Sequence, residues 1–162
     1  MMNHPGMRYM SGMQQFFLKK SLKEMNKHIT YEGEDYRGSR LEIYFEMIEA
    51  LHNADARLLL GTDAGNPFVF PGYSIHEELQ YLVDAGLTPY EAILAGTRNA
   101  AESLNAINEF GTVTVGKRAD LILIEGNPLE DVANVNKRSG VMLRGTWFSE
   151  DQLRTMLSEL AD

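Results

Sequence analysis

The residue best placed for chemistry is Asp63, which follows a short apolar run and lies between Gly61 and Gly65. The run Arg57 to Leu60 predicts a buried strand, so Asp63 is expected at its C-terminal end. Strand ends hold side chains rigidly above a sheet, and α/β proteins place their chemistry there. Two interpretations of these residues stay open: an active-site carboxylate, or an aspartate that only accepts hydrogen bonds from a Gly-rich turn.

Helix signals flank the predicted strand on both sides. Capping-box patterns predict helices over residues 39–53 and 74–85. A third start signal, with proline at the first helical position, predicts a helix over 88–104. Nearer the N-terminus, apolar spacing predicts one helix over 14–27, followed by a polar loop over 31–38. A helix, a buried strand and a polar Gly-rich loop together form an α/β unit.

The composition changes near Asn105, and we place a domain boundary between residues 104 and 110. Beyond it, short strands with tight turns are predicted over 111–116, 119–124 and 140–148. Trp147 is expected to anchor a core. Ser149 with Gln152 predicts the cap of a final helix.

Three stretches resemble the amidohydrolase superfamily, in its imidazolonepropionase-like and prolidase-like branch: Leu58 to Gly65, Pro71 to Leu79, and Ala85 to Ala92. Further motifs up to Asp131 resemble the return of that family from its barrel into a small β-sandwich. The resemblance implies an α/β fold. Residues 1–105 would be the terminal portion of a (β/α)8 TIM barrel, and residues 106–162 part of the β-sandwich plus a C-terminal helix.

The resemblance also implies an activity, which is metal-dependent hydrolysis of C–N bonds in a small-molecule substrate. Non-peptide amides, cyclic amides and Xaa-Pro-like substrates all stay open. Asp63 matches the family's aspartate at the end of strand eight, which contacts a divalent metal, with zinc expected, and moves a proton. His76 matches a position at the pocket mouth that contacts substrate, although a histidine that merely packs on the loop fits equally well.

The sequence departs from the family in its metal ligands. It contains no His-x-His pair, and a complete barrel takes about 250 residues, more than the 162 present. The chain is therefore interpreted as a fragment that is inactive alone and needs a missing N-terminal portion or a homo-oligomer. The alternative is a non-catalytic remnant or an oligomeric binding module. A carbohydrate-active enzyme with two carboxylates fits poorly, because only Asp63 lies at a recognisable strand end.

Composition limits the remaining choices. With 15 basic and 23 acidic side chains the net charge is −8, which disfavours nucleic acid and membrane surfaces as partners. There is no cysteine, so a thiolate metal site is excluded. We expect a cytoplasmic protein in which His4, His28 and His52 are structural or solvated, and in which the N-terminal methionines pack rather than bind a metal.

Overall fold

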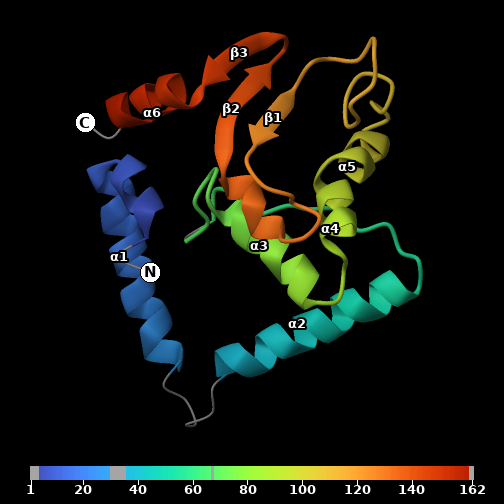
Figure 1. Cartoon of the computed structure of the whole chain (residues 1–162). Coiled ribbons are helices and arrows are strands. Elements are labelled where there is room, and N and C mark those ends of the chain that lie inside the picture. Colours follow the sequence, from blue (N-terminus) through green and yellow to red (C-terminus); the bar gives the residue numbers. More distant parts are fainter. Residues whose placement is uncertain (1–3, 30–35, 67, 161–162) are drawn as a thin grey trace.

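The computed structural model describes residues 4–29, 36–66 and 68–160 (Figure 1). Their elements, in chain order, are η1 (Pro5–Tyr9), α1 (Gly12–Ile29), α2 (Tyr36–Asn53), α3 (Ser74–Asp84), α4 (Pro89–Gly96), α5 (Arg98–Ser103), β1 (Leu121–Ile124), η2 (Val132–Asn136), β2 (Arg138–Leu143), β3 (Thr146–Ser149) and α6 (Glu150–Glu159). Helices dominate the first two thirds of the chain, and a small sheet with one covering helix forms the last third. This mixture confirms the α/β class.

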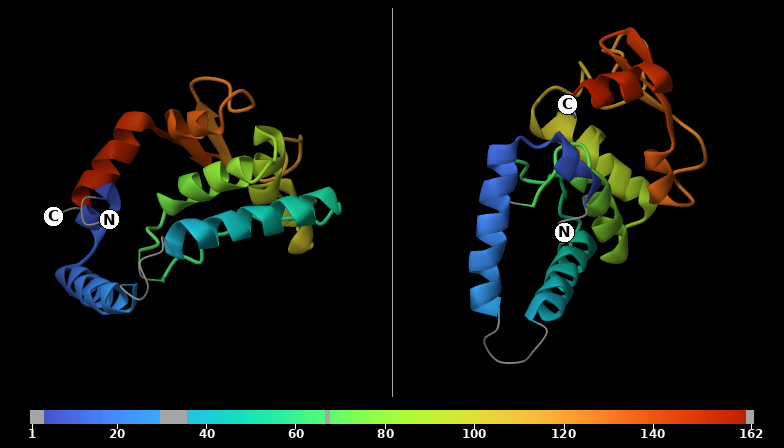
Figure 2. Two further views of the ribbon diagram at one scale, coloured as in Figure 1. Left: turned by 90° about the horizontal axis from the view of Figure 1, so that it is seen from below. Right: turned by 90° about the vertical axis from the view of Figure 1, so that its left-hand side faces the viewer.

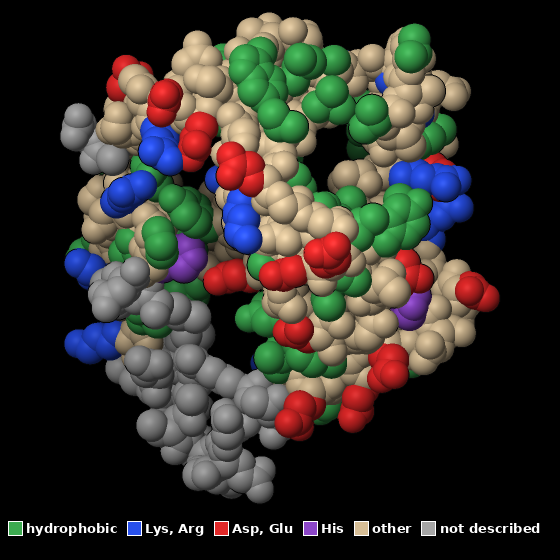
Figure 3. Space-filling view, viewed as in Figure 1, with side chains coloured by type: hydrophobic (Ala, Val, Ile, Leu, Met, Phe, Trp, Pro, Cys, Tyr) green, Lys and Arg blue, Asp and Glu red, His purple; other side chains and the backbone are tan. Residues whose placement is uncertain are grey.

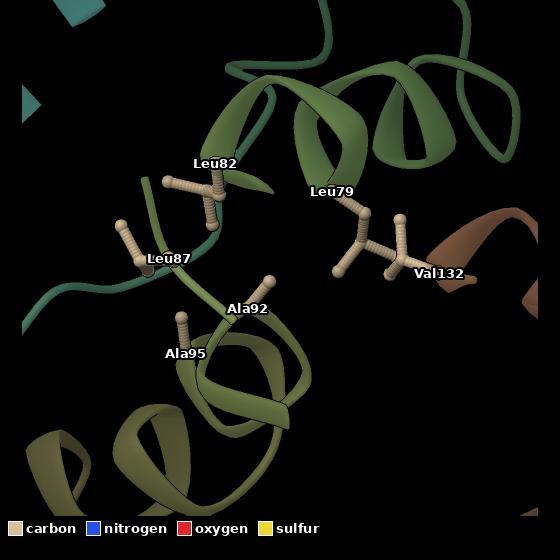
Figure 4. Packing of buried hydrophobic residues seen from close by; sticks show 6 residues of the cluster. All are labelled: Leu79, Leu82, Leu87, Ala92, Ala95 and Val132. Atoms are coloured by element: carbon tan, nitrogen blue, oxygen red, sulfur yellow. The ribbon is translucent and has the colours of Figure 1, made fainter. Parts of the chain in front are cut away.

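The main core lies between α3 and α4, and η2 closes it from the C-terminal side (Figure 4). Its buried members are Leu79, Leu82, Leu87, Ala92, Ala95 and Val132. The alanines on α4 let the two helices approach closely, while the leucines supply most of the apolar area. Val132 therefore attaches the C-terminal segment to the helical part.

The capping box predicted at Ser74 is wrong, because Tyr73 is the N-cap residue of α3 and makes no side-chain cap hydrogen bond. Two other predicted helix caps are confirmed. Thr88 and Glu91 cap the start of α4 reciprocally, and Ser149 and Gln152 do the same for α6. The helix predicted over 88–104 is wrong in one respect, because it breaks into α4 and α5 at Thr97. The Thr97 hydroxyl donates to the carbonyl of Ile93 at 2.7 Å, and the Thr97 backbone leaves the helical region at φ −124° and ψ −88°.

The strand predicted over 57–60 is not formed, and this is a correction to the sequence interpretation. The Leu60 amide donates to the carbonyl of Ala95 at 3.1 Å, and the Asn99 side chain donates to the carbonyl of Leu58 at 3.1 Å. Leu58 and Leu60 still pack against the core. Since no other strand lies beside this segment in the described part of the chain, its backbone bonds to helices instead.

The sheet is antiparallel in the order β1-β2-β3. Residues 111–116, predicted as a strand, form turns and irregular backbone, so this prediction is wrong. Trp147 was expected to anchor a core, yet it is 43% exposed and packs over Gly140 of the neighbouring strand. Within the described ranges this is the one sheet, so the barrel and sandwich portions of the expected fold stay predictions.

The N-terminal segment is more ordered than its sequence indicated. Helix α1 extends beyond the predicted 14–27, and α2 begins at Tyr36, inside the predicted loop and ahead of the Ser39 capping pattern. The rest of that loop, 31–35, lies outside the described residues. In both views of Figure 2, α1 and α2 lie apart from one another, and η1 lies near the C-terminal end of α6. Over the described residues, no helix combines the length and apolar character that crossing a membrane requires.

Candidate functional site

Asp63 lies in a tight turn directly after the Leu58–Leu60 segment. Its backbone is left-handed at φ +53°, and Gly65 follows at φ +118°. The Asn66 side chain donates to Oδ2 of Asp63 at 2.5 Å, and the Asn66 amide donates to the Asp63 carbonyl at 3.3 Å. The Asp63 side chain is exposed. The turn therefore presents a carboxylate to solvent and orients it through one neighbouring amide.

The loop after this turn is held by buried aromatic packing. Phe70 is buried together with Met7 and Leu18 from the N-terminal segment. The ring of His4 stacks on Phe70 at 4.2 Å with an interplanar angle of 8°. The Phe70 amide also donates to the hydroxyl of Ser74 at 3.0 Å, at the start of α3. The N-terminal segment thus fixes the position of the loop that follows Asp63.

His4 has a structural role, as its sequence context indicated. Its Nδ1 accepts a hydrogen bond from the Gly6 amide at 3.1 Å and so caps η1. Its Nε2 lies 3.9 Å from a carboxylate oxygen of Glu77 on α3. His52 lies 3.7 Å from Glu91 on the other side of the molecule. The side chain of His28 is outside the described residues.

His76 lies in the first turn of α3 and faces strand β2. Its Nε2 is 3.2 Å from Nη1 of Arg138, a residue 62 positions later in the chain. Its Nδ1 is buried and has no hydrogen-bond partner among the described residues. Burial, and then the Arg138 charge, lower the pKa of His76, so the ring is neutral near neutral pH. A neutral Nε2 can accept a hydrogen bond from the Arg138 guanidinium, which stays protonated.

The two predicted site residues are not brought together by any direct bond in the described structure. Asp63 is bonded to Asn66, whereas His76 is bonded to Arg138. Sequence reasoning missed both partners. Asn66 carried a local signal, since an amide three residues after an aspartate is typical of a side-chain-stabilised turn. Arg138 carried none.

A second carboxylate of interest is Glu78, two residues after His76 on α3. Burial, and then its acidic neighbour Glu77, raise the pKa of Glu78. Raised carboxylic pKa values occur at functional sites and also in ordinary packing, so this shift alone assigns no role. No pattern in the sequence distinguishes Glu78 from the other acidic residues.

The described residues do not by themselves form a metal site. No group of three or more His, Asp or Glu side chains in this part of the chain lies close enough together to hold an ion. Asp63 offers one oxygen ligand, with its Oδ2 already accepting from Asn66. Catalytic zinc sites use three protein ligands, so the remaining ligands would have to come from elsewhere.

A cleft of about 510 Å³ opens beside the Asp63 turn. Its walls come from η1, α1, loop residues 65–66 and 68–73, and the end of α6, and Asn66 is one of its lining residues. In Figure 3 hydrophobic side chains gather in this region, between α6 and the N-terminal segment. Asn66, whose side chain orients Asp63, therefore also forms part of the cleft wall.

Comparison with known proteins identifies the family of this chain. A sequence model of the amidohydrolase family matches residues 18–148. An imidazolonepropionase from Geobacillus sp. (strain WCH70) is 39% identical over 74 residues, covering 45% of this chain and 17% of the relative. An ochratoxinase from Aspergillus niger is 41% identical over 81 residues, covering 49% of this chain and 16% of the relative. The chain thus spans less than a fifth of the length of these two relatives.

Solved structures are also similar to this chain. A Xaa-Pro dipeptidase superposes with a TM-score of 0.59 and 27% identity, over 65% of this chain and 25% of the other. A bottromycin amidohydrolase superposes with a TM-score of 0.76 over 98% of this chain and 35% of the other; at 23% identity it shows the fold alone. Because the family model matches most of the sequence, this chain belongs to the amidohydrolase family.

Proposed function

We propose that this chain is part of a metal-dependent hydrolase that acts on C–N bonds of small molecules, with Asp63 as the proton-transferring residue. The observation that carries the proposal is the exposed, Asn66-oriented carboxylate inside the segment that matches the family. The names of the relatives are consistent with amide, cyclic amide or Xaa-Pro-like substrates. Family members generally bind divalent metals, and zinc is the metal we expect here.

Asp63 would act as a general base and then as a general acid. Its carboxylate accepts a proton from the attacking water and later delivers that proton to the leaving nitrogen as the C–N bond breaks. Asn66 holds Oδ2 throughout, which fixes the direction of the carboxylate. A divalent ion bound at the complete site would polarise the water.

We further propose that the isolated chain is inactive and that other polypeptide completes the site. Asp63 supplies one ligand, and the chain covers only a small share of the relatives that it matches. The remaining ligands would come from a further N-terminal portion or from another copy. His76 is the proposed substrate contact, because a polar substrate group that reached its Nδ1 would satisfy that buried atom.

The test is the substitution Asp63→Asn in the protein assembled with its complete metal site. The loss of the proton acceptor should lower kcat by about 100-fold or more while the melting temperature stays unchanged. Asp55→Asn is a matched control, because Asp55 is also exposed and also left-handed, at φ +56°. Full turnover by the Asp63→Asn protein would refute the assignment.

The alternative is a non-catalytic remnant or an oligomeric binding module. The exposed apolar edge strand β1 is the observation that favours it. Size-exclusion chromatography with light scattering, combined with metal analysis of the purified chain, separates the two. A defined oligomer that binds stoichiometric zinc would show that copies complete one another's sites. A defined oligomer that stays metal-free at excess zinc would favour the binding module.

A further inference from the structure

The cleft beside the Asp63 turn differs from the rest of the surface in its charge. The sequence contains 15 basic and 23 acidic side chains. None of them lines this cleft in the described part of the chain. Its polar lining side chains are mainly neutral amides and hydroxyls, including Gln14, Ser21 and Asn66. A charged ligand would lose its hydration here without gaining a partner of opposite charge.

The apolar walls of the cleft are largely aromatic. Phe17 enters from α1, Phe68 and Phe70 from the loop, and Tyr9 and Tyr73 flank them. Phe70 is buried, so the loop side of the cleft is fixed, whereas Phe17 is 57% exposed and meets the ring of Phe16 edge-on at 5.9 Å, which leaves part of its surface open to a ligand. Aromatic rings recognise other rings through stacking and edge contacts at centroid distances of about 4.5–7 Å. The volume of about 510 Å³ is in the ordinary range for a small-molecule site.

We propose that this cleft binds an uncharged aromatic group of the substrate, next to the C–N bond that is cleaved. This inference rests on the proposed function and narrows it to neutral amides that carry an aromatic ring. The link to the chemistry is Asn66, which lines the cleft and donates to Oδ2 of Asp63. A ring in the cleft therefore places the adjoining amide near the carboxylate.

The test measures binding to the full 162-residue chain and needs no turnover. N-acetyl-phenylalaninamide is the aromatic probe, and N-acetyl-alaninamide and N-acetyl-phenylalanine, which carries a carboxylate, are the comparisons. Burial of the ring should give the aromatic amide an affinity about tenfold or more above that of the alanine amide. The carboxylate analogue should bind more weakly than the aromatic amide. Ligand-observed NMR titration or equilibrium dialysis gives all three values.

Two residues of α1 provide matched variants. Phe17 lines the cleft, whereas Met13, 72% exposed, is outside its lining. Phe17→Ala should weaken binding of N-acetyl-phenylalaninamide by about fivefold or more, and Met13→Ala should leave it within about twofold. Equal binding of the aromatic and alanine amides, or equal effects of the two substitutions, would overturn the proposal.

The same titration separates this inference from the catalytic one. Asp63→Asn should leave binding of N-acetyl-phenylalaninamide unchanged even where turnover is lost, because Asp63 is not a lining residue. Turnover that depends on Asp63 without selective ring binding would leave the proposed function intact and refute the cleft assignment. Selective ring binding together with turnover that is independent of Asp63 would support the cleft assignment and refute the proposed role of Asp63.

Discussion

At the scale of single residues, the hydrogen bond between His76 on α3 and Arg138 on β2 links the protonation of one histidine to the contact between these two elements. Burial and the neighbouring guanidinium lower the pKa of His76 from its ordinary value near 6.5. The unfolded chain therefore binds a proton to this ring at a higher pH than the folded chain does. Stability is unaffected by this group well above pH 6.5, and it falls as the pH drops below that value.

The prediction is that His76→Gln flattens the pH dependence of stability. Melting temperatures measured between about pH 7.5 and about pH 5.5 should fall less steeply in this variant than in the parent chain. His52→Gln is the control, because His52 lies at a different contact, with Glu91. An unchanged slope in the His76 variant would show that this ring does not contribute to acid sensitivity.

The contrast between Asp63 and His76 also shows how far single residues can be interpreted. The type and spacing of Asp63 identified a candidate carboxylate, and its turn partner Asn66 is only three residues away. The partner of His76 is 62 residues away. Local partners leave a pattern in the sequence, whereas distant ones are chosen by the fold.

At the scale of elements, the sheet depends on a close contact between β2 and β3. A Cβ atom added to Gly140 would lie 2.2 Å from a ring carbon of Trp147 and 2.8 Å from the carbonyl oxygen of Phe148. Gly140 is paired with Ser149 of β3 and with Leu123 of β1, so the backbone has partners on both sides. Glycine is therefore required at position 140, because the neighbouring atoms leave no room for a Cβ atom.

The prediction is that Gly140→Ala destabilises the protein by about 1–3 kcal/mol, because the added methyl group displaces Trp147 or the strands. Urea unfolding followed by circular dichroism measures this difference. The control is Gly12→Ala in α1, where nothing lies within 4 Å of the added Cβ. Alanine in that helix should be neutral or stabilising by up to about 1 kcal/mol. Equal unfolding midpoints for Gly140→Ala and the parent would contradict the steric argument.

At the scale of the whole molecule, β1 forms an open edge of the sheet with apolar side chains exposed on it. Leu121, Ile122 and Leu123 are 38%, 54% and 56% exposed. Hydrophobic side chains gather over the sheet at the top of Figure 3. An exposed apolar edge strand is a template for pairing with another strand. We therefore expect the purified chain to self-associate as its concentration rises.

A charge on this edge should oppose that association. Ile122→Lys should move its onset to a concentration about tenfold higher, a change of about 1.4 kcal/mol. Leu104→Lys serves as the control, since Leu104 is 68% exposed but follows α5, outside the sheet. Light scattering over a concentration series measures the onset of association for the parent chain and both variants. Association that is insensitive to Ile122→Lys would place the contact elsewhere.

The sequence by itself determined the features that depend on near neighbours. The capping boxes at Thr88 and Ser149 were predictable because each joins residues three positions apart. The family followed from motifs of a few residues around Asp63, and the helices of the core followed from start signals at Ser74 and Thr88. In each case the stabilising partner lies within one or two helical turns of the residue concerned.

Tertiary structure alone decided the features that need distant partners. The run 57–60 has the composition of a strand, but its backbone bonds to Ala95 and Asn99 instead. Trp147 is a residue type that commonly anchors a core, but its position over Gly140 leaves it partly exposed. The aromatic cleft joins η1, α1, loop residues 65–66 and 68–73, and α6, which are far apart in the sequence. A strand, a core or a cleft exists only once remote segments meet, because each element supplies only part of its hydrogen bonds and contacts.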